Sequence, residues 1–148
     1  MGDLKDCNHV TEIEKYLRKV DYIIRIKGRE ILNDFNITSP QFTALQILIN
    51  NGNMTIGELS QKMSLACSTI TDLVGRMEKT DLVIRKKDTE DKRVVRVEVL
   101  PKGFDILEKV LDKRRKFLEL KLSNFDKEQK EALSRGLYEL YIAMNNES

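Results

Sequence analysis

The stretch that decides the fold runs from Thr55 to Val99, TIGELSQKMSLACSTITDLVGRMEKTDLVIRKKDTEDKRVVRVEV. Its first part has a helical period, because apolar residues recur there at spacings of three and four positions. Thr55 is a capping residue, and Glu58, three positions later, completes a capping-box pattern. The sequence therefore predicts a helix that begins at Thr55, with a buried face made of Ile56, Leu59 and Met63.

A second helix is predicted from about Cys67 to Lys79, after a turn too short to be a linker. Its apolar stripe consists of Ile70, Leu73, Val74 and Met77, and its polar face of Ser68, Thr69, Thr71, Asp72, Gly75, Arg76 and Lys79. Short hydroxyl side chains let a helix enter a DNA major groove and bond to base edges or phosphates. Gly75 leaves room for a sugar-phosphate strand at a helix-propensity cost of about 1 kcal/mol. A solvated face would give the same pattern.

After Asp81 the period changes from helical to alternating, which predicts strands over residues 82–87 and 94–99. The connection, residues 88–93, is charged and longer than a tight hairpin turn. From Arg85 to Arg96 there are six basic residues against three acidic ones. Charge on a hairpin can simply protect its edge from aggregation. A charged hairpin that follows two such helices in the sequence, however, is typical of a DNA-binding wing.

The run from Ile37 to Leu107 resembles the MarR family of bacterial transcription regulators. The matching motifs are Ser-Pro-Gln-Phe (39–42), Thr-Ile-Gly-Glu-Leu (55–59), Ser-Thr-Ile-Thr (68–71), Asp-Thr-Glu-Asp-Lys-Arg (88–93) and Leu-Pro-Lys-Gly (100–103). The resemblance implies a homodimer with two winged helix-turn-helix domains, with the second helix in the major groove. It also implies that Arg93 enters the minor groove and that Asp91 orients neighbouring arginines.

Three positions depart from the family pattern. Leu100 stands where a threonine usually caps the next helix, so that helix is expected to begin at Pro101 without this cap, at a cost of about 1 kcal/mol. Ala66 replaces a common acidic cap, which leaves Cys67 or Ser68 to cap the second helix. Asp72 falls where basic residues are frequent, and it either accepts a hydrogen bond from cytosine or repels phosphate.

The segments before and after the stretch from Thr55 to Val99 also have helical periods. A long stripe runs from Val10 to Phe35, whereas residues 1–9 lack a period and are expected to be a mobile tail. Ser39 followed by Pro40 predicts the cap and first position of the next helix, and Asn51-Gly52 predicts its end. Beyond Pro101 a long helix is expected, then a break at residues 123–126 and a last helix. Because no further domain covers these terminal helices, pairing with a second chain explains them.

These observations predict a mostly α fold with a small β-hairpin wing. Residues 1–36 form an N-terminal tail and dimerisation helix, residues 37–100 the winged helix-turn-helix domain (hereafter the reading head), and residues 101–148 the C-terminal dimerisation helices. With 148 residues, 41% hydrophobic and 34% charged, the chain suits one compact unit plus such helices. A net charge of +2 is modest, so basic residues must be concentrated locally.

Other classes of protein fit the sequence less well. No apolar run approaches the roughly 20 residues of a membrane span, and no signal-peptide pattern is present, so a cytoplasmic protein without membrane contact is expected. The single histidine, His9, and the absence of a Gly-rich phosphate loop argue against an enzyme. The two cysteines have no metal-ligand spacing. We therefore expect no metal and no cofactor.

The sequence predicts a homodimeric repressor that binds double-stranded DNA at an inverted-repeat operator. The two half-sites of this operator should lie about one helical turn apart. A small phenolic or lipophilic effector, of the kind that the resemblance implies, would release it. The predicted DNA contacts are Ser68, Thr69, Thr71, Asp72, Arg76, Lys86, Lys87, Lys92 and Arg93.

Two alternatives remain at this stage. Cys67 is a candidate redox sensor, because a helix N-terminus favours the thiolate, but it also suits a small capping or packing residue. Cys7 lies closer to the chain start than the sensor cysteine of organic-hydroperoxide regulators and is expected to be a free thiol. The other alternative is an interaction adaptor that does not bind DNA. Asp72 and the modest net charge favour it, and Arg93 with the hydroxyl-rich helix face argues against it.

Overall fold

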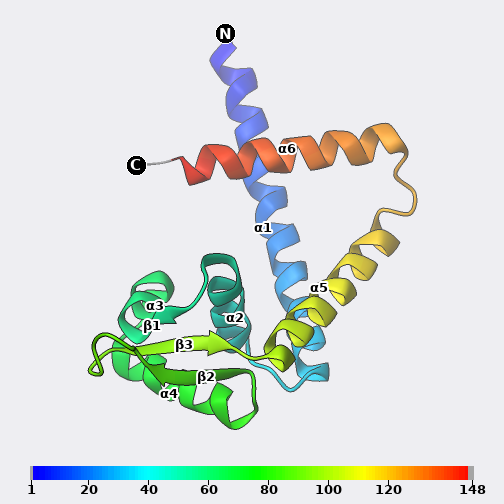
Figure 1. Ribbon diagram of the computed structural model, residues 1–148. Coiled ribbons are helices and arrows are strands. Elements are labelled where there is room, and N and C mark those ends of the chain that lie inside the picture. Colours follow the sequence, from blue (N-terminus) through cyan, green and yellow to red (C-terminus); the bar gives the residue numbers. More distant parts are fainter. Residues whose placement is uncertain (1, 147–148) are drawn as a thin grey trace. The chain divides into compact units, whose positions relative to one another are not determined.

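The computed structural model describes the backbone of residues 2–146 and the side chains of residues 9–146. Two compact units make up the chain, residues 1–112 and 113–148. Along the sequence the elements are α1 (Gly2–Asp34), α2 (Ser39–Asn51), β1 (Met54–Thr55), α3 (Ile56–Met63), α4 (Cys67–Lys79), β2 (Val83–Lys87), β3 (Val95–Val99), α5 (Pro101–Lys121) and α6 (Lys127–Asn145) (Figure 1). The protein is thus mostly helical with a small sheet, as the sequence predicted.

The sheet is antiparallel and has the order β1-β3-β2. β2 and β3 form the predicted hairpin, in which Lys86 lies opposite Arg96. The sequence missed β1, which adds a third strand by pairing Met54 with Val97. Two residues are too few to show an alternating period, so this strand is defined only by its partner.

A single hydrophobic core holds the reading head together. α2, α3, α4 and the sheet all contribute to it, and the end of α1 and the first part of α5 close it. Its largest fully buried side chains are Leu45, Leu48, Leu59, Ile70, Val74, Met77, Val83, Val97 and Val110. The apolar faces predicted for the two helices of the motif therefore point into this core.

The N-terminal cap of α2 is Thr38 and not Ser39, so that prediction was wrong by one residue. The Thr38 hydroxyl accepts a hydrogen bond from the Gln41 amide at 3.3 Å, and Gln41 Oε1 accepts one from the Thr38 amide at 3.1 Å. This reciprocal pair is a capping box. At the other end, Gly52 has a φ of +85°, which favours glycine and ends the helix at the predicted place.

α5 begins at Pro101, as the sequence predicted, and packs closely on the strand pair. The Leu100 amide donates to the Leu82 carbonyl at 2.9 Å. A Cβ added at Gly103 would lie 2.5 Å from that same Leu82 oxygen and 2.7 Å from Val99 Cγ1. Only glycine therefore fits between α5 and the end of β3.

α1 is helical from Gly2, so the expected irregular tail over residues 1–9 is not found in the described part, residues 2–9. Ile31 and Leu32, near its end, are buried in the core. Further towards the N-terminus its large apolar side chains are exposed, and these are Val10, Ile13, Tyr16, Leu17, Val20, Tyr22, Ile23 and Ile26. A long apolar surface of this kind is typical of an interface with another chain.

In the second unit, α6 follows the predicted break. Asp126 caps the helix by accepting from the Gln129 amide at 2.8 Å, and Gln129 Oε1 accepts from the Asp126 amide at 2.9 Å. None of the residues of α6 is buried. Its exposed apolar side chains are Leu133, Leu137, Tyr138, Tyr141 and Met144.

Candidate nucleic-acid interface

α3, its following turn and α4 form a helix-turn-helix. Thr55 caps α3, as predicted, by accepting a hydrogen bond from the Glu58 amide at 3.0 Å. The turn begins at Ser64, which has a left-handed backbone with a φ of 55°. The Ser60 hydroxyl, 9% exposed, donates to the Leu65 carbonyl and so ties the turn to α3. This local bonding sets the direction in which α4 leaves the turn.

α4 spans the residues that the sequence predicted, but its cap differs. Ala66 occupies the N-cap position and makes no side-chain cap bond. The expectation that Cys67 or Ser68 caps the helix is therefore wrong, because both lie inside it. Cys67 is exposed, and its thiol is free. The first turn of α4 thus keeps its amide donors available to an outside acceptor.

The hydroxyl-bearing face of α4 is exposed to solvent. Ser68, Thr69 and Thr71 all lie on it. The Thr71 hydroxyl donates to the Cys67 carbonyl at 2.8 Å, so its oxygen remains an acceptor. Asp72 pairs with Arg76 one turn later, with an oxygen-to-nitrogen distance of 3.2 Å. The predicted contact residues of this helix therefore share one accessible surface.

One ion pair beside this surface was missed by the sequence. The Arg85 amide donates to Glu78 Oε2 at 2.8 Å, and Arg85 Nη2 donates to Glu78 Oε1 at 3.1 Å. The bond from the Arg85 amide, followed by the guanidinium bond, lowers the pKa of Glu78. The two residues lie in α4 and β2, so no helical or strand spacing could reveal them. They line a hollow of about 520 Å³ together with Thr71, Asp72, Gly75, Arg76 and Lys79.

The hairpin loop is closed at its base by Asp88. Its amide donates to the Val94 carbonyl at 2.9 Å, and its two carboxylate oxygens accept from Arg96 Nε at 2.9 Å and from the Asp91 amide at 3.1 Å. The Arg96 guanidinium is the main cause of a lowered pKa for Asp88, and the amide bond adds to it. The loop is therefore bonded internally at both ends.

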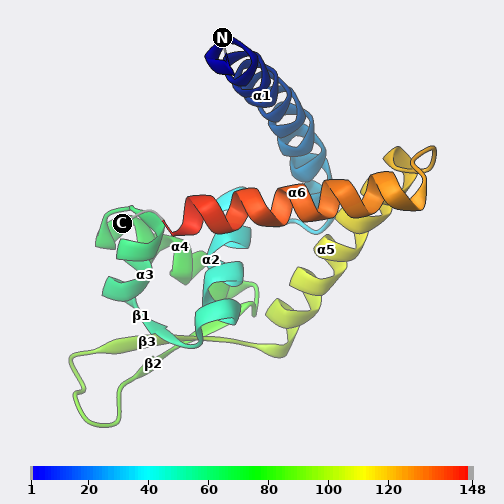
Figure 2. The same ribbon diagram turned by 90° about the horizontal axis from the view of Figure 1, so that it is seen from above.

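At the tip, Asp91 holds Arg93. Asp91 Oδ1 accepts from both the amide and Nε of Arg93 at 3.1 Å, and the Arg93 bonds lower the pKa of the Asp91 carboxyl. The Arg93 side chain is nevertheless 91% exposed. Figure 2 shows the loop between β2 and β3 extending beyond α3 and α4.

The three predicted lysines also lie on the hairpin. Lys86 pairs with Glu98 across the two strands at 3.0 Å, and Lys87 and Lys92 are exposed.

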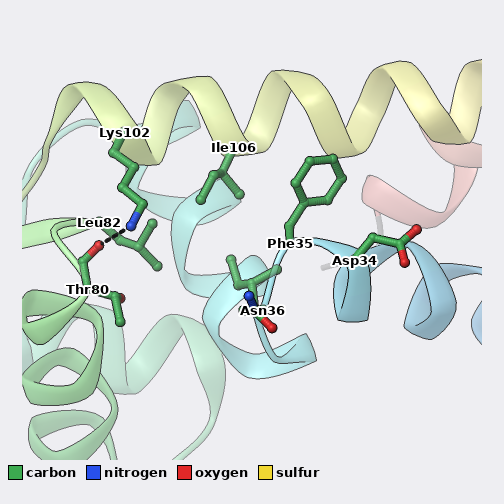
Figure 3. Close-up of a pocket in the computed structure, with 8 residues that line it drawn as sticks. Asp34, Phe35, Asn36, Thr80, Leu82, Lys102 and Ile106 are labelled. Carbon is green, nitrogen blue, oxygen red and sulfur yellow. Dashed lines mark hydrogen bonds between the residues drawn. The ribbon is translucent and has the colours of Figure 1, made fainter.

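A separate cavity of about 380 Å³ lies where the end of α1 meets the turn before β2 and the start of α5. Lys102 Nζ donates to the Thr80 carbonyl at 2.9 Å on one side of it, and Figure 3 shows Phe35 and Ile106 as apolar lining and Asp34 at the end away from Lys102. The other lining residues are Asn36, Ile37 and Leu82.

The described residues hold no group of three or more His, Cys, Asp or Glu side chains arranged to bind a metal. Within the same residues, no helix has the length and apolar character that crossing a membrane requires. Cys7 lies outside the described side chains.

A helix-turn-helix whose second helix is exposed, followed by a projecting basic hairpin, defines a winged helix-turn-helix DNA-binding protein. The family model described as the MarR family matches residues 37–95. An uncharacterised HTH-type transcriptional regulator of Bacillus subtilis, YsmB, is 49% identical over 140 residues, which cover 95% of this chain and 96% of that protein. The chain belongs to the MarR family and is a DNA-binding transcription regulator, not an enzyme.

Two further proteins are similar. The structure of a MarR family protein from Bacillus stearothermophilus superposes with a TM-score of 0.85 at 45% identity, covering 94% of this chain and 97% of that one. The organic hydroperoxide resistance transcriptional regulator of Bacillus subtilis is 32% identical over 84 residues, 57% of each chain.

Proposed function

We propose that this protein is a homodimer that binds an inverted-repeat DNA operator, with α4 in the major groove and the hairpin wing in the minor groove. The observation that carries the proposal is the exposed Arg93, held at the hairpin tip by Asp91. An exposed arginine on a projecting loop suits the narrow, electronegative minor groove. The hydroxyl-rich face of α4 lies in the same unit and has the short side chains that a major groove admits.

Each predicted contact has a role in this proposal. Ser68, Thr69, Thr71, Asp72 and Arg76 on α4 meet bases or phosphates, Arg93 enters the minor groove, and Lys86, Lys87 and Lys92 meet the backbone. Asp91 orients Arg93. Because Asp72 pairs with Arg76, we assign Asp72 to orienting that guanidinium as well.

The dimer is supported by the exposed apolar surfaces of the terminal helices. Membership of the MarR family implies the same arrangement, a homodimer with two reading heads. α1 and α6 expose large apolar side chains along their lengths. We therefore assign residues 1–36 and 101–148 to dimerisation and residues 37–100 to DNA reading. Two-fold symmetry would place two copies of α4 about one DNA turn, roughly 34 Å, apart.

We further propose that a small phenolic or lipophilic ligand releases the protein from DNA, as in a repressor. The cavity beside Phe35 and Ile106 supports this, because it combines apolar lining with the cationic Lys102 where α1 and α5 meet the reading head. A ligand there would act by favouring a different separation of the two reading heads. It must bind the free dimer more tightly than the DNA-bound dimer.

Fluorescence anisotropy tests the DNA proposal. The purified protein is titrated onto duplex DNA from upstream of its own gene, at several salt concentrations and with non-specific competitor. Salt-sensitive binding that resists competitor is expected. If the protein binds the upstream DNA weakly, and no more tightly than it binds the competitor, then either its operator lies elsewhere or it is an interaction adaptor. Selection of bound sequences from random DNA would separate these two explanations. If peroxide weakens DNA binding by the parent protein but not by the Cys67→Ser variant, the redox-sensing alternative is favoured.

Light scattering tests the dimer. Val20 is 50% exposed on α1, so Val20→Asp should leave the core of the reading head unchanged and lower the mass to that of a monomer. Thr11→Asp on the same helix places an equal charge outside the apolar surface and serves as the control. A monomeric parent protein would refute the dimer.

A further inference from the structure

Neither the backbone conformation nor the packing of the described part of the protomer requires a glycine at position 75. It lies inside α4, where glycine disfavours the helix relative to alanine. Among the described residues, no neighbouring heavy atom would lie within 4 Å of a Cβ added there. Alanine would therefore stabilise α4 without a clash. The space above Gly75 is open to a molecule outside the protomer.

That space belongs to the hollow between α4 and β2. Arg76, Lys79 and Arg85 supply three cations, against the two carboxylates of Asp72 and Glu78. Asp72 pairs with Arg76 at 3.2 Å and Glu78 with Arg85 at 3.1 Å. The hollow thus has one positive charge in excess, and Lys79 supplies it.

Arg85 is the best-oriented of these cations. Glu78 fixes it at two points, through the backbone amide at 2.8 Å and through Nη2 at 3.1 Å. A guanidinium has five N–H donors, and the contact with Glu78 uses only one of its nitrogens. The other donors remain available for an anionic partner that accepts two parallel hydrogen bonds, such as the two non-bridging oxygens of a phosphate.

The position of the hollow identifies its occupant. It separates the helix that we place in the major groove from the hairpin that we place in the minor groove. Adjacent major and minor grooves are divided by one sugar-phosphate strand, so a protein that enters both must face that strand between the two elements.

We propose that the hollow over Gly75 seats this backbone strand, with one phosphate bound by Arg85 and Lys79 and with Glu78 as the positioning residue for Arg85. In this proposal position 75 is a glycine because the DNA strand passes so close to the α4 backbone that a Cβ would clash with it. The inference rests on the proposed placement of α4 and the wing, and it assigns phosphate contacts to Lys79 and Arg85, two residues beyond the DNA contacts predicted from the sequence.

The first test is Gly75→Ala. The melting temperature Tm should rise by a few degrees, because helix propensity improves. The dissociation constant should increase about tenfold on two duplexes of about 30 base pairs, one from upstream of the protein's own gene and one of scrambled sequence, because a backbone contact is independent of sequence. Gly57→Ala on α3 is the control, because Gly57 is an exposed helical glycine outside the proposed DNA contacts and the dimerisation helices, and its added Cβ would lie 3.9 Å from Thr55 Oγ1, an ordinary contact distance; it should leave both constants unchanged.

The second test is Arg85→Gln, which should flatten the slope of log Kobs against log salt concentration by about one. Arg25→Gln is the matched control, because Arg25 is also an exposed arginine paired with a carboxylate, Asp21, at 3.0 Å. Its slope should equal that of the parent.

The outcomes separate the two proposals. If the parent protein binds neither duplex, the proposed function fails. If the parent binds but Gly75→Ala binds equally well, or Arg85→Gln keeps the full salt slope, only the backbone seat fails. A loss confined to the upstream duplex would assign a base contact to the hollow and would also overturn the inference.

Discussion

Asp91 Oδ1 accepts two hydrogen bonds from Arg93, one from its amide and one from Nε, both at 3.1 Å. Asp91 Oδ2 adds a third contact, with Arg93 Nη2 at 3.3 Å. Because the pair is exposed, it contributes little to stability. Its effect is on ordering, since a guanidinium that is already oriented loses less rotamer freedom when it binds DNA.

The first prediction concerns Arg93 itself. Arg93→Ala should weaken DNA binding about 10- to 100-fold while leaving Tm unchanged, because the side chain contacts only the loop. Asp91→Asn should weaken binding less, because the guanidinium remains but is less well oriented. Anisotropy titration measures both, with Arg25→Ala as the control. Equal affinity of Arg93→Ala and the parent would remove the wing from the binding surface.

The second prediction concerns Gly103, where a Cβ would lie 2.5 Å from the Leu82 carbonyl oxygen. Gly103→Ala should lower the free energy of unfolding by about 1–3 kcal/mol, because α5 must move away from the end of β3. Urea denaturation measures this change. Gly57→Ala, whose added Cβ would lie at an ordinary 3.9 Å from Thr55 Oγ1, should be neutral or stabilising. If Gly103→Ala were as stable as the parent, the close contact between α5 and β3 would be wrong.

The third prediction separates two neighbouring residues at the start of α2. Thr38→Ala should cost about 1 kcal/mol of stability, because it removes the side-chain half of the capping box. Ser39→Ala should change stability little, because Ser39 lies within the helix and alanine is a good helix former. Urea midpoints of the two variants test this order, and a larger loss for Ser39→Ala would contradict it.

The fourth prediction concerns pH and Asp88, whose pKa is lowered by Arg96 and then by the Asp91 amide. A carboxyl with a lowered pKa in the folded state stabilises that state above its ordinary pKa of about 3.9, and this contribution is lost as pH falls through the lowered value. The stability difference between Asp88→Asn and the parent should therefore be constant from about pH 8 to pH 5 and shrink below about pH 4. Thermal unfolding across this range measures it. A constant difference down to pH 3 would show that the ionised carboxylate is not the stabilising form.

Much of the fold could be predicted because its signals are local. The bounds of α4, Cys67–Lys79, follow from apolar spacing on one face. The start of α5 at Pro101 follows from the fixed φ of proline, and the end of α2 at Gly52 from a φ that suits glycine. Errors arose where two local signals competed, as at Thr38 and Ser39, because both are good capping residues.

The residues of the candidate DNA-binding site also fall into those that the sequence could predict and those that it could not. The exposed face of α4 and the basic hairpin are visible in the sequence, because each has its own period or charge pattern. The pairing of Glu78 with Arg85 is not visible, because it joins a helix to a strand. β1 is equally hidden, since its two residues are ordered only by hydrogen bonds to β3.

The sequence by itself determined the helices of the reading head, the two hairpin strands, their buried faces and the family to which the chain belongs, because these depend on side-chain spacing within one segment. Only the tertiary structure decided which side chains from different segments meet. It placed Arg85 beside Gly75 and Lys79 and brought Gly103 against Leu82. The physical reason is that hydrogen bonds and packing act over a few ångströms in space, irrespective of separation along the chain.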